Sequence, residues 1–155
     1  TCSDHTIYQK FIGLKNQLNE NIHCHIELGF DEELAHLIYA GSDMFILPSV
    51  FEPCGLSHMI AMKYGTIPVV RSTGGLVDSV FDRDYSNVSW DKRNGYTFTH
   101  NDNHGIESAL QRAMGLYYDY PDHFRNLMGN AMRYDFSWNI PGTHYENVFN
   151  FIRHK

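Results

Sequence analysis

The chain has 155 residues, of which 43% are apolar, and this length and composition suffice for one domain with a hydrophobic core. With 12 basic and 18 acidic residues the net charge is −6, which argues against nucleic acid as a partner. We expect no membrane partner either, because no apolar run has the length of a transmembrane helix. The chain shows neither an initiating Met nor a signal-peptide pattern, so we expect it to be part of a longer protein.

The chain has three cysteines (Cys2, Cys24 and Cys54) but no CxxC pair, so the sequence predicts neither a disulfide framework nor a thiolate zinc site. A reducing compartment fits this pattern. His23 and His25 would share one face of a strand, a spacing that could serve metal binding, but an exposed strand face explains them better. Since no third ligand follows nearby, we expect no bound metal.

The first third of the chain predicts helix, strand, helix and strand. A helical stripe over His5–Leu18 indicates a surface helix, and alternating apolar residues over 22–28 predict a strand. Asp31 is an N-cap candidate for a helix that Gly41 closes. The apolar run Met44–Leu47 has the length and composition of a buried strand.

The middle of the chain continues this alternation. Leu56 opens a helix that ends at Gly65, residues 66–70 predict a buried strand, and residues 95–99 predict a short one. The polar segment 82–94 lacks apolar periodicity and indicates a loop. Alternating strands and helices predict a Rossmann-like three-layer α/β/α domain with a parallel sheet and right-handed crossovers.

Helices are predicted for the last third. Residues 100–103 and Pro121 are typical of helix starts, and a final helix over about 136–152 is expected to be interrupted at Pro141 and Gly142. Aromatic residues recur in this final helix, where a packing face explains their spacing better than a ligand-stacking surface does. We expect a single domain of residues 1–155 with a helical tail from about residue 136.

Two turns combine the residues of a binding site. After the strand Met44–Leu47 come Glu52, Pro53 and Gly55, and the amides at the following helix start are suited to an anion. A second glycine-rich turn over residues 71–76 follows the next strand. Parallel strands deliver their carboxyl ends to one sheet edge, so both turns are expected to face one ligand.

Three motifs occur in register along the chain: FEPCGLS at 51–57, MKYGTIP at 62–68 and RSTGGLVDSV at 71–80. They closely resemble the C-terminal half of the starch and bacterial glycogen synthases. The stretch 32–43 and DFSW at 135–138 fit as well, so the resemblance covers nearly the whole chain. Within that family the sequence looks most similar to plant-type soluble starch synthases of classes III and IV.

This resemblance implies a two-domain glycosyltransferase of the GT-B architecture, with this chain as its donor-binding half. The implied reaction transfers glucose from ADP-glucose to the non-reducing end of an α-1,4-glucan, with retention at the anomeric carbon. The implied partners are ADP-glucose, the glucan and an N-terminal domain on which the tail of residues 136–155 would pack. The implied location is the plastid, or the cytoplasm for a bacterial protein.

Matching motifs also imply roles for individual residues. Glu52 would lie against the glucose hydroxyls as the catalytic residue, Ser57 would hold the diphosphate, and Phe30 would stack on adenine. The backbone of residues 54–56 would line the sugar. Together with the second turn, the predicted donor-binding residues are Phe30, Cys54, Gly55, Leu56, Ser57, Thr73, Gly74 and Gly75.

The sequence departs from its relatives at two positions, and the family's remaining apparatus would precede its first residue. The residue at the place of Phe30 is usually Tyr, and related transferases carry an acid on the ribose eight residues after Glu52, where this chain has Ile60. The starch synthase branch generally lacks this acid too. The acceptor groove and the cations that clamp the diphosphate would lie upstream, so we expect no catalysis by the chain alone. Arg71 is the nearest cation within it, although Arg71 is also placed to pair with Asp78 or Asp82. No cofactor is expected, because the acid-rich cluster that Mg²⁺ needs is missing.

Simpler interpretations remain for the same residues. Glu52 is explained as a turn carboxylate near a helix start, Cys54 as a small packed residue, and Phe30 as part of the core. The second turn is explained as a tight connection, and His58 and Lys63 as solvated helix residues. As a whole, the chain is explained either as part of an enzyme or as a non-catalytic nucleotide- or glucan-binding module. An NAD-dependent oxidoreductase is disfavoured because no Gly-x-Gly-x-x-Gly follows a first strand.

Overall fold

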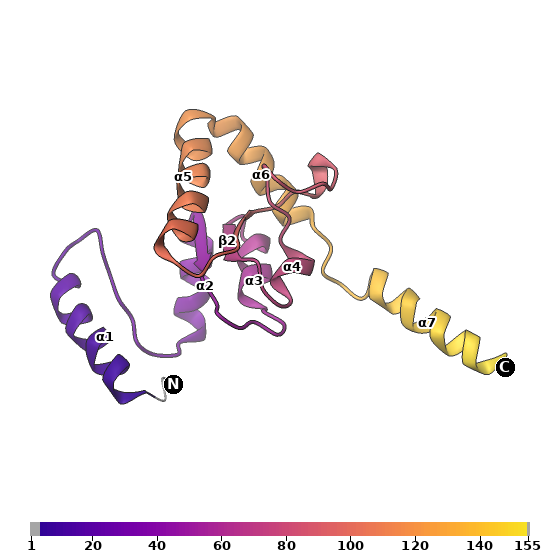
Figure 1. The fold of residues 1–155 in the computed structure, drawn as a ribbon, viewed down its shortest axis with the longest axis horizontal. Coiled ribbons are helices and arrows are strands. Elements are labelled where there is room, and N and C mark those ends of the chain that lie inside the picture. Colours follow the sequence, from indigo (N-terminus) through magenta and orange to yellow (C-terminus); the bar gives the residue numbers. More distant parts are fainter. Residues whose placement is uncertain (1–3, 155) are drawn as a thin grey trace. The chain divides into compact units, whose positions relative to one another are not determined.

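The computed structural model describes residues 4–154 and contains two compact units, one of Thr1–Leu37 and the other of Ile38–Lys155 (Figure 1). Cys2 lies outside the described residues, whereas Cys24 and Cys54 are free thiols. Even the longest described helix, with 17 residues, is too short and too polar to cross a bilayer, and the same holds for the other helices over residues 4–154.

The first unit begins with the predicted surface helix, α1 (His5–Leu18). Asp4 is its N-cap, and the Asp4 Oδ1 atom accepts hydrogen bonds from the backbone N–H groups of Thr6 at 2.8 Å and of Ile7 at 3.2 Å. These bonds satisfy two of the amides that a helix start leaves unpaired. The predicted helix is therefore confirmed with its bounds.

The strand predicted over residues 22–28 is wrong, because residues 22 and 23 lie in a turn and residues 24–28 pair with no strand among the described residues. Its backbone finds a side chain instead of a neighbouring strand. The Asn19 amide accepts from Ile26 N at 2.7 Å and donates to Ile26 O at 3.1 Å, as a strand neighbour would. Alternating apolar residues indicate an extended chain, but they do not show whether a partner strand exists.

The helix predicted after Asp31 is confirmed as α2 (Glu32–Gly41). Asp31 Oδ1 accepts from Leu34 N at 3.0 Å, which is the N-cap interaction that the sequence indicated. Glu32 and Glu33 occupy the first turn, where the helix dipole favours negative charge.

The second unit contains a parallel sheet of three strands in the order β1 (Met44–Leu47), β2 (Ile67–Arg71) and β3 (Tyr96–Phe98). All three were expected from the sequence. β2 is central, and its first four residues are buried, as a strand covered on both faces requires. The Rossmann-like fold class is confirmed.

The helices of this unit connect, cover or follow the strands of the sheet. They are α3 (Ser57–Lys63), α4 (Leu76–Ser79), the 3₁₀ turn η1 (Trp90–Lys92), α5 (Asn103–Asp119), α6 (Pro121–Arg133) and α7 (Asn139–Arg153). The interruption expected in the last helix is wrong. Pro141 is the third residue of α7, inside the first turn, where its missing N–H group costs no intrahelical hydrogen bond. None of the α7 residues is buried.

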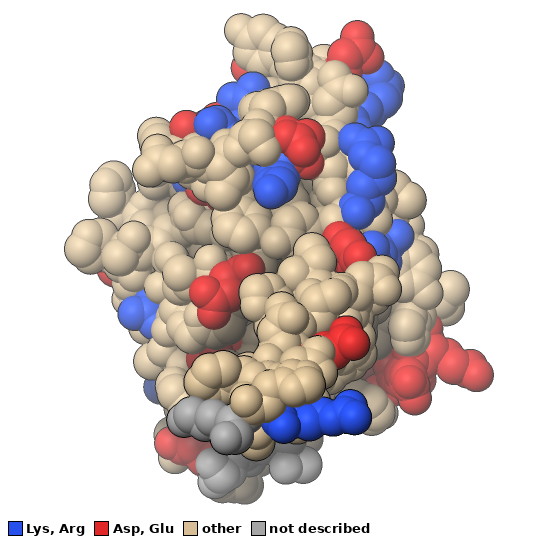
Figure 2. Space-filling model, turned by 90° about the vertical axis from the view of Figure 1, so that its right-hand side faces the viewer, with Lys and Arg blue, Asp and Glu red and all other residues tan. Residues whose placement is uncertain are grey.

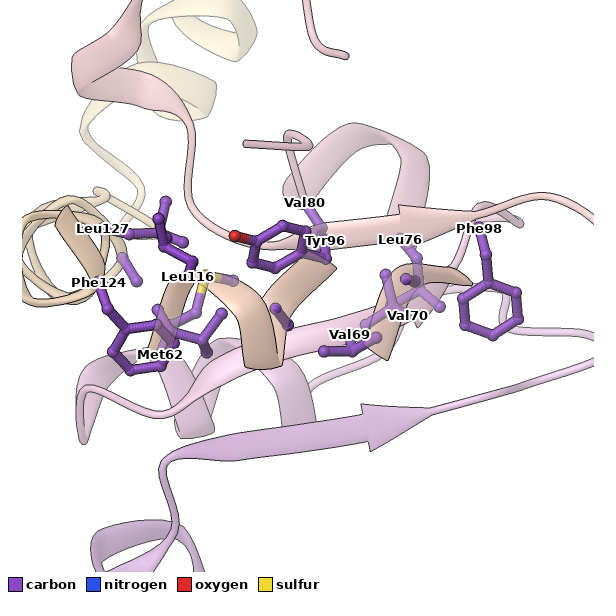
Figure 3. Close-up of a cluster of buried hydrophobic side chains, with 14 residues drawn as sticks. Met62, Val69, Val70, Leu76, Val80, Tyr96, Phe98, Leu116, Phe124 and Leu127 are labelled. Atoms are coloured by element: carbon purple, nitrogen blue, oxygen red, sulfur yellow. The ribbon is translucent and has the colours of Figure 1, made fainter. Parts of the chain in front are cut away.

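The hydrophobic core lies around β2 (Figure 3). One end of the cluster gathers Met62 of α3, Leu116 of α5 and Phe124 and Leu127 of α6. At the other end, towards which the strand arrowheads point, lies Phe98, with Leu76 beside it. On the face shown in Figure 2, Lys and Arg side chains are interspersed with Asp and Glu, in keeping with the net charge of −6.

A buried ion pair fixes the loop between α4 and β3. The Asp82 side chain is only 5% exposed, and its two oxygens accept from Arg112 Nη1 at 2.9 Å and Nη2 at 3.1 Å. Thr97 N also donates to Asp82, at 2.6 Å. Burial acts to raise the pKa of Asp82, but the hydrogen bonds from Arg112 and the backbone outweigh it and the pKa is lowered. The carboxylate is therefore charged and fully partnered.

Removing Arg112 leaves this buried carboxylate without its counter-charge. We expect Arg112→Ala to lower the free energy of unfolding by about 3–5 kcal/mol, measured by urea denaturation. The control is Arg125→Ala, which removes the exposed Arg125–Asp122 pair and is expected to change stability little. Equal stability of the two variants would contradict a structural role for the Asp82–Arg112 pair.

Candidate functional site

The first predicted turn, residues 48–56, connects β1 to α3 and carries Glu52. The Glu52 side chain is half-buried, and its Oε2 atom accepts a hydrogen bond from Ser49 Oγ at 2.9 Å. Gly55 has a φ of 76°, a conformation that strains any residue with a side chain. The carboxylate is thus held in place by its own turn. Ser49 was not singled out from the sequence, although its position three residues before the acid is a signal for such a bond.

The second turn, which links β2 to α4, is in direct backbone contact with the first. Gly75 N donates to Glu52 O at 2.9 Å. A Cβ atom at Gly74 would overlap Glu52 O, and one at Gly75 would overlap Cys54 O. Glycine is therefore required at 74 and 75 by close approach of two backbones, as well as by the φ of 50° at Gly74. The two turns lie together at one edge of the sheet, as expected, and the Gly75 N–H group is used in the bond between them. Whether both turns face one ligand stays a prediction.

Arg71 stabilises the same edge of the sheet. Its guanidinium donates to Val50 O at 2.8 Å, in the segment after β1, and to Thr99 O at 3.2 Å, in the segment after β3. A third, longer bond goes to Ser49 O at 3.4 Å. All three partners are backbone carbonyls, so the pairing of Arg71 with Asp78 or Asp82 that the sequence allowed is wrong. Because Arg71 ends β2, one side chain ties together the chain segments that follow all three strands.

His58 is fully buried, at 0% exposure, and the interpretation of His58 as a solvated helix residue is wrong. Its Nε2 atom lies 2.7 Å from Ser79 Oγ, and Ser79 Oγ donates to Gly75 O at 2.8 Å. Burial lowers the pKa of His58, against an opposing effect of the Glu52 carboxylate. The imidazole is therefore neutral, and it contacts the second turn through Ser79.

Lys63 is also structural. Its Nζ atom donates to the carbonyls of Met132 at 3.0 Å and Tyr134 at 2.7 Å, at the end of α6, and it lies over the Phe136 ring at 5.8 Å. A cation at that end satisfies carbonyls that the helix leaves unpaired. Lys63 is exposed, in agreement with its interpretation as a solvated residue, and its ammonium group also binds the end of α6.

Three other predicted residues have distinct environments. Cys54 is exposed, so its interpretation as a small packed residue is wrong. Leu56 is the N-cap of α3 and Ser57 its first residue, and no side chain caps this helix start. Phe30 belongs to the first unit and is 93% exposed, so it is not part of the core. Whether Phe30 stacks on adenine stays a prediction.

No group of three or more His, Cys, Asp and Glu side chains is arranged to hold a metal ion within residues 4–154. A pocket of about 410 Å³ borders the first turn and is lined by Leu56, Met59, Ile60, Lys63 and Phe136. Most of these side chains are apolar, and Ile60, the position of the ribose acid in related transferases, is among them.

Structural comparison defines the class of protein. The chain is similar to the catalytic domain of starch synthase IV from Arabidopsis thaliana bound to ADP and acarbose, with a TM-score of 0.89 and 43% identity. The match covers 96% of this chain and 30% of that one. A sucrose-phosphate synthase from Thermosynechococcus elongatus, at a TM-score of 0.65 and 23% identity, shows the fold alone. The fold is that of a GT-B glycosyltransferase.

Residues 8–126 match the family described as Glycosyl transferases group 1, and the chain belongs to this family. It is 59% identical to a glycogen synthase of Methylococcus capsulatus over 98% of its length, and 57% identical to one of Nitrosococcus oceani over 97%. It spans about a third of these relatives, 31% in each case. The resemblance to starch and glycogen synthases is confirmed. Both relatives are bacterial and lend no support to the expected plastid location.

The contact between the turns predicts a large effect of one methyl group. We expect Gly74→Ala to lower the free energy of unfolding by about 2–3 kcal/mol, because the new Cβ would overlap Glu52 O and the positive φ would be strained. Chemical denaturation measures this loss. The matched control is Gly115→Ala in α5, where nothing lies within 4 Å of the added Cβ and the helix gains stability. A Gly74→Ala protein as stable as the wild type would show that the turns do not need this approach.

Proposed function

We propose that the chain is the donor-binding half of a retaining glucosyltransferase that moves glucose from ADP-glucose to the non-reducing end of an α-1,4-glucan. The observation that carries this proposal is the union of the two turns, which fixes Glu52 at the carboxyl edge of the sheet. Ligands of open α/β sheets bind at this edge. Further support comes from relatives named glycogen synthase and from the starch synthase structure that holds ADP.

In this proposal the residues act on charge that develops during transfer. The bond between the anomeric carbon and the diphosphate breaks, so positive charge develops on the sugar and negative charge on the departing ADP. Glu52 contacts the glucose hydroxyls and stabilises the sugar. Thr73 and the amides at Gly74 and at the start of α3, including Ser57, contact the diphosphate, and Phe30 stacks on adenine. The backbone from Cys54 to Leu56 lines the sugar.

A non-catalytic binding module is the second candidate function. The observation in its favour is that the chain spans only 31% of the glycogen synthases it matches. The acceptor-binding half and the cations of the complete site would then lie elsewhere in the protein. The two candidate functions agree if the 155-residue chain binds ADP-glucose without transferring glucose, while the intact protein transfers it.

Glu52→Gln tests the catalytic role in the intact protein. The amide keeps the size of the side chain but removes its charge, so we expect glucosyl transfer from ADP-glucose to fall by about 10²-fold or more. Initial rates at saturating donor measure the loss. Glu107→Gln, which changes an exposed carboxylate on α5, is the control and is expected to leave the rate unchanged. Turnover by Glu52→Gln within a few-fold of wild type would remove Glu52 from the reaction.

Phe30→Ala tests the adenine contact. Loss of a stacking ring is expected to weaken ADP binding by roughly 1–3 kcal/mol, measured by calorimetry on the intact protein. The control is Ile22→Ala, which truncates another side chain of the first unit that is 92% exposed. If both variants bind ADP as the wild type does, Phe30 is not part of the nucleotide site.

Removal of divalent cations tests whether transfer is metal-free. Backbone amides and cationic side chains can stabilise the diphosphate without a metal, so we expect transfer by the intact protein to continue in EDTA at an unchanged rate. The activity is measured before and after chelation and dialysis. Loss of activity on chelation, with recovery on adding Mg²⁺, would contradict the proposed mechanism.

A further inference from the structure

His58 contacts both turns from the buried side of the site. The Cε1 and Nδ1 atoms of its ring lie 3.0 Å and 3.1 Å from the place where a Cβ on Gly55 would stand, so the ring packs closely against the first turn. On the other side Nε2 reaches Ser79 Oγ, which bonds to Gly75 O of the second turn. One side chain therefore connects the two turns at a second place, apart from the bond between Gly75 N and Glu52 O.

The directions of these hydrogen bonds follow from the donors present. Ser79 has one hydroxyl proton and, of its two partners, Gly75 O is a carbonyl that only accepts. The Ser79 proton therefore goes to Gly75 O, and Ser79 Oγ accepts from His58 Nε2–H. Because the ring is neutral, His58 Nδ1 then carries no proton, and this buried atom has no hydrogen-bond partner among residues 4–154. The ring is the neutral Nε2–H tautomer.

We propose that His58 is a positioning residue that sets the geometry of the Glu52 turn through the chain of bonds His58 Nε2–H to Ser79 Oγ–H to Gly75 O. Gly75 is the shared member of both connections, because its carbonyl accepts from Ser79 and its N–H donates to Glu52 O. His58 does not contact the sugar nucleotide in this scheme. Its importance for transfer rests on the proposed function, whereas the hydrogen-bond chain does not.

The test compares variants of the intact protein that keep or remove the hydrogen-bond donor at position 58. His58→Leu fills similar space without an N–H group, and Ser79→Ala breaks the chain at its middle member. We expect each to lower the maximal rate of glucosyl transfer by about tenfold or more, since a small displacement of a reacting group costs this much. Their effects should not add in the double variant, because both substitutions interrupt the same series of hydrogen bonds.

Two controls separate positioning from loss of stability. His58→Gln carries an amide N–H near the place of Nε2 and is expected to restore the rate. Met62→Ala opens a cavity in the core from the same helix, α3, and is expected to lower the thermal midpoint without lowering the rate at temperatures where it is folded. A His58→Leu rate equal to that of wild type, or a His58→Gln rate as low as that of His58→Leu, would overturn the proposal.

A ligand-free measurement keeps this inference distinct from the proposed function. Nitrogen-15 NMR of the imidazole should show a proton on Nε2 and none on Nδ1, and the amide signal of Gly75 should shift in His58→Leu but stay near its wild-type position in His58→Gln. A proton on Nδ1 or an unmoved Gly75 signal would overturn the positioning role. Absence of glucosyl transfer in the wild type would instead overturn the proposed function alone.

Discussion

The close approach of two backbone turns is the constraint on which the rest of the site depends. Gly75 N bonds to Glu52 O, and the carbonyls of residues 52 and 54 occupy the space that side chains at 74 and 75 would need. Two parallel strands place these turns next to each other, and glycine lets them touch. The carboxylate of Glu52 is thereby held by the fold itself, which is the preorganisation that a stabiliser of transition-state charge requires.

The residues around the turns add rigidity at different depths. Arg71 joins the segments after all three strands by bonds to carbonyls, and His58 joins the turns from the buried side through Ser79. Below them the core around β2 and the Asp82–Arg112 pair keep the sheet and the loop before β3 in place. Histidine is costly here, because its Nδ1 atom is buried without a partner. A neutral ring that donates from one nitrogen is the form that fits both turns.

Much of this was predictable from the sequence, and the errors have identifiable causes. Apolar periodicity identified the three strands and the longer helices but not α4 or the 3₁₀ turn η1, and glycine beside proline and a carboxylate identified the first turn. The strand expected over residues 22–28 does not form, and the backbone of Ile26 bonds to the Asn19 side chain instead of to a neighbouring strand. His58 and Arg71 were misinterpreted because their partners lie 21 to 28 residues away in the chain. Local pattern predicts elements and turns, whereas long-range hydrogen bonds depend on the assembled fold.

The central claim is that the two turns form one donor-binding unit. Titration of the 155-residue chain with ADP, UDP and NAD, followed by backbone amide shifts, tests it most directly. With part of the complete site elsewhere, affinity for ADP is expected to be only about millimolar, near −4 kcal/mol. We expect ADP alone to shift the amides of residues 55–57 and of 74–75 with the same saturation curve. Shifts confined to one turn, or an equal response to NAD, would contradict the claim.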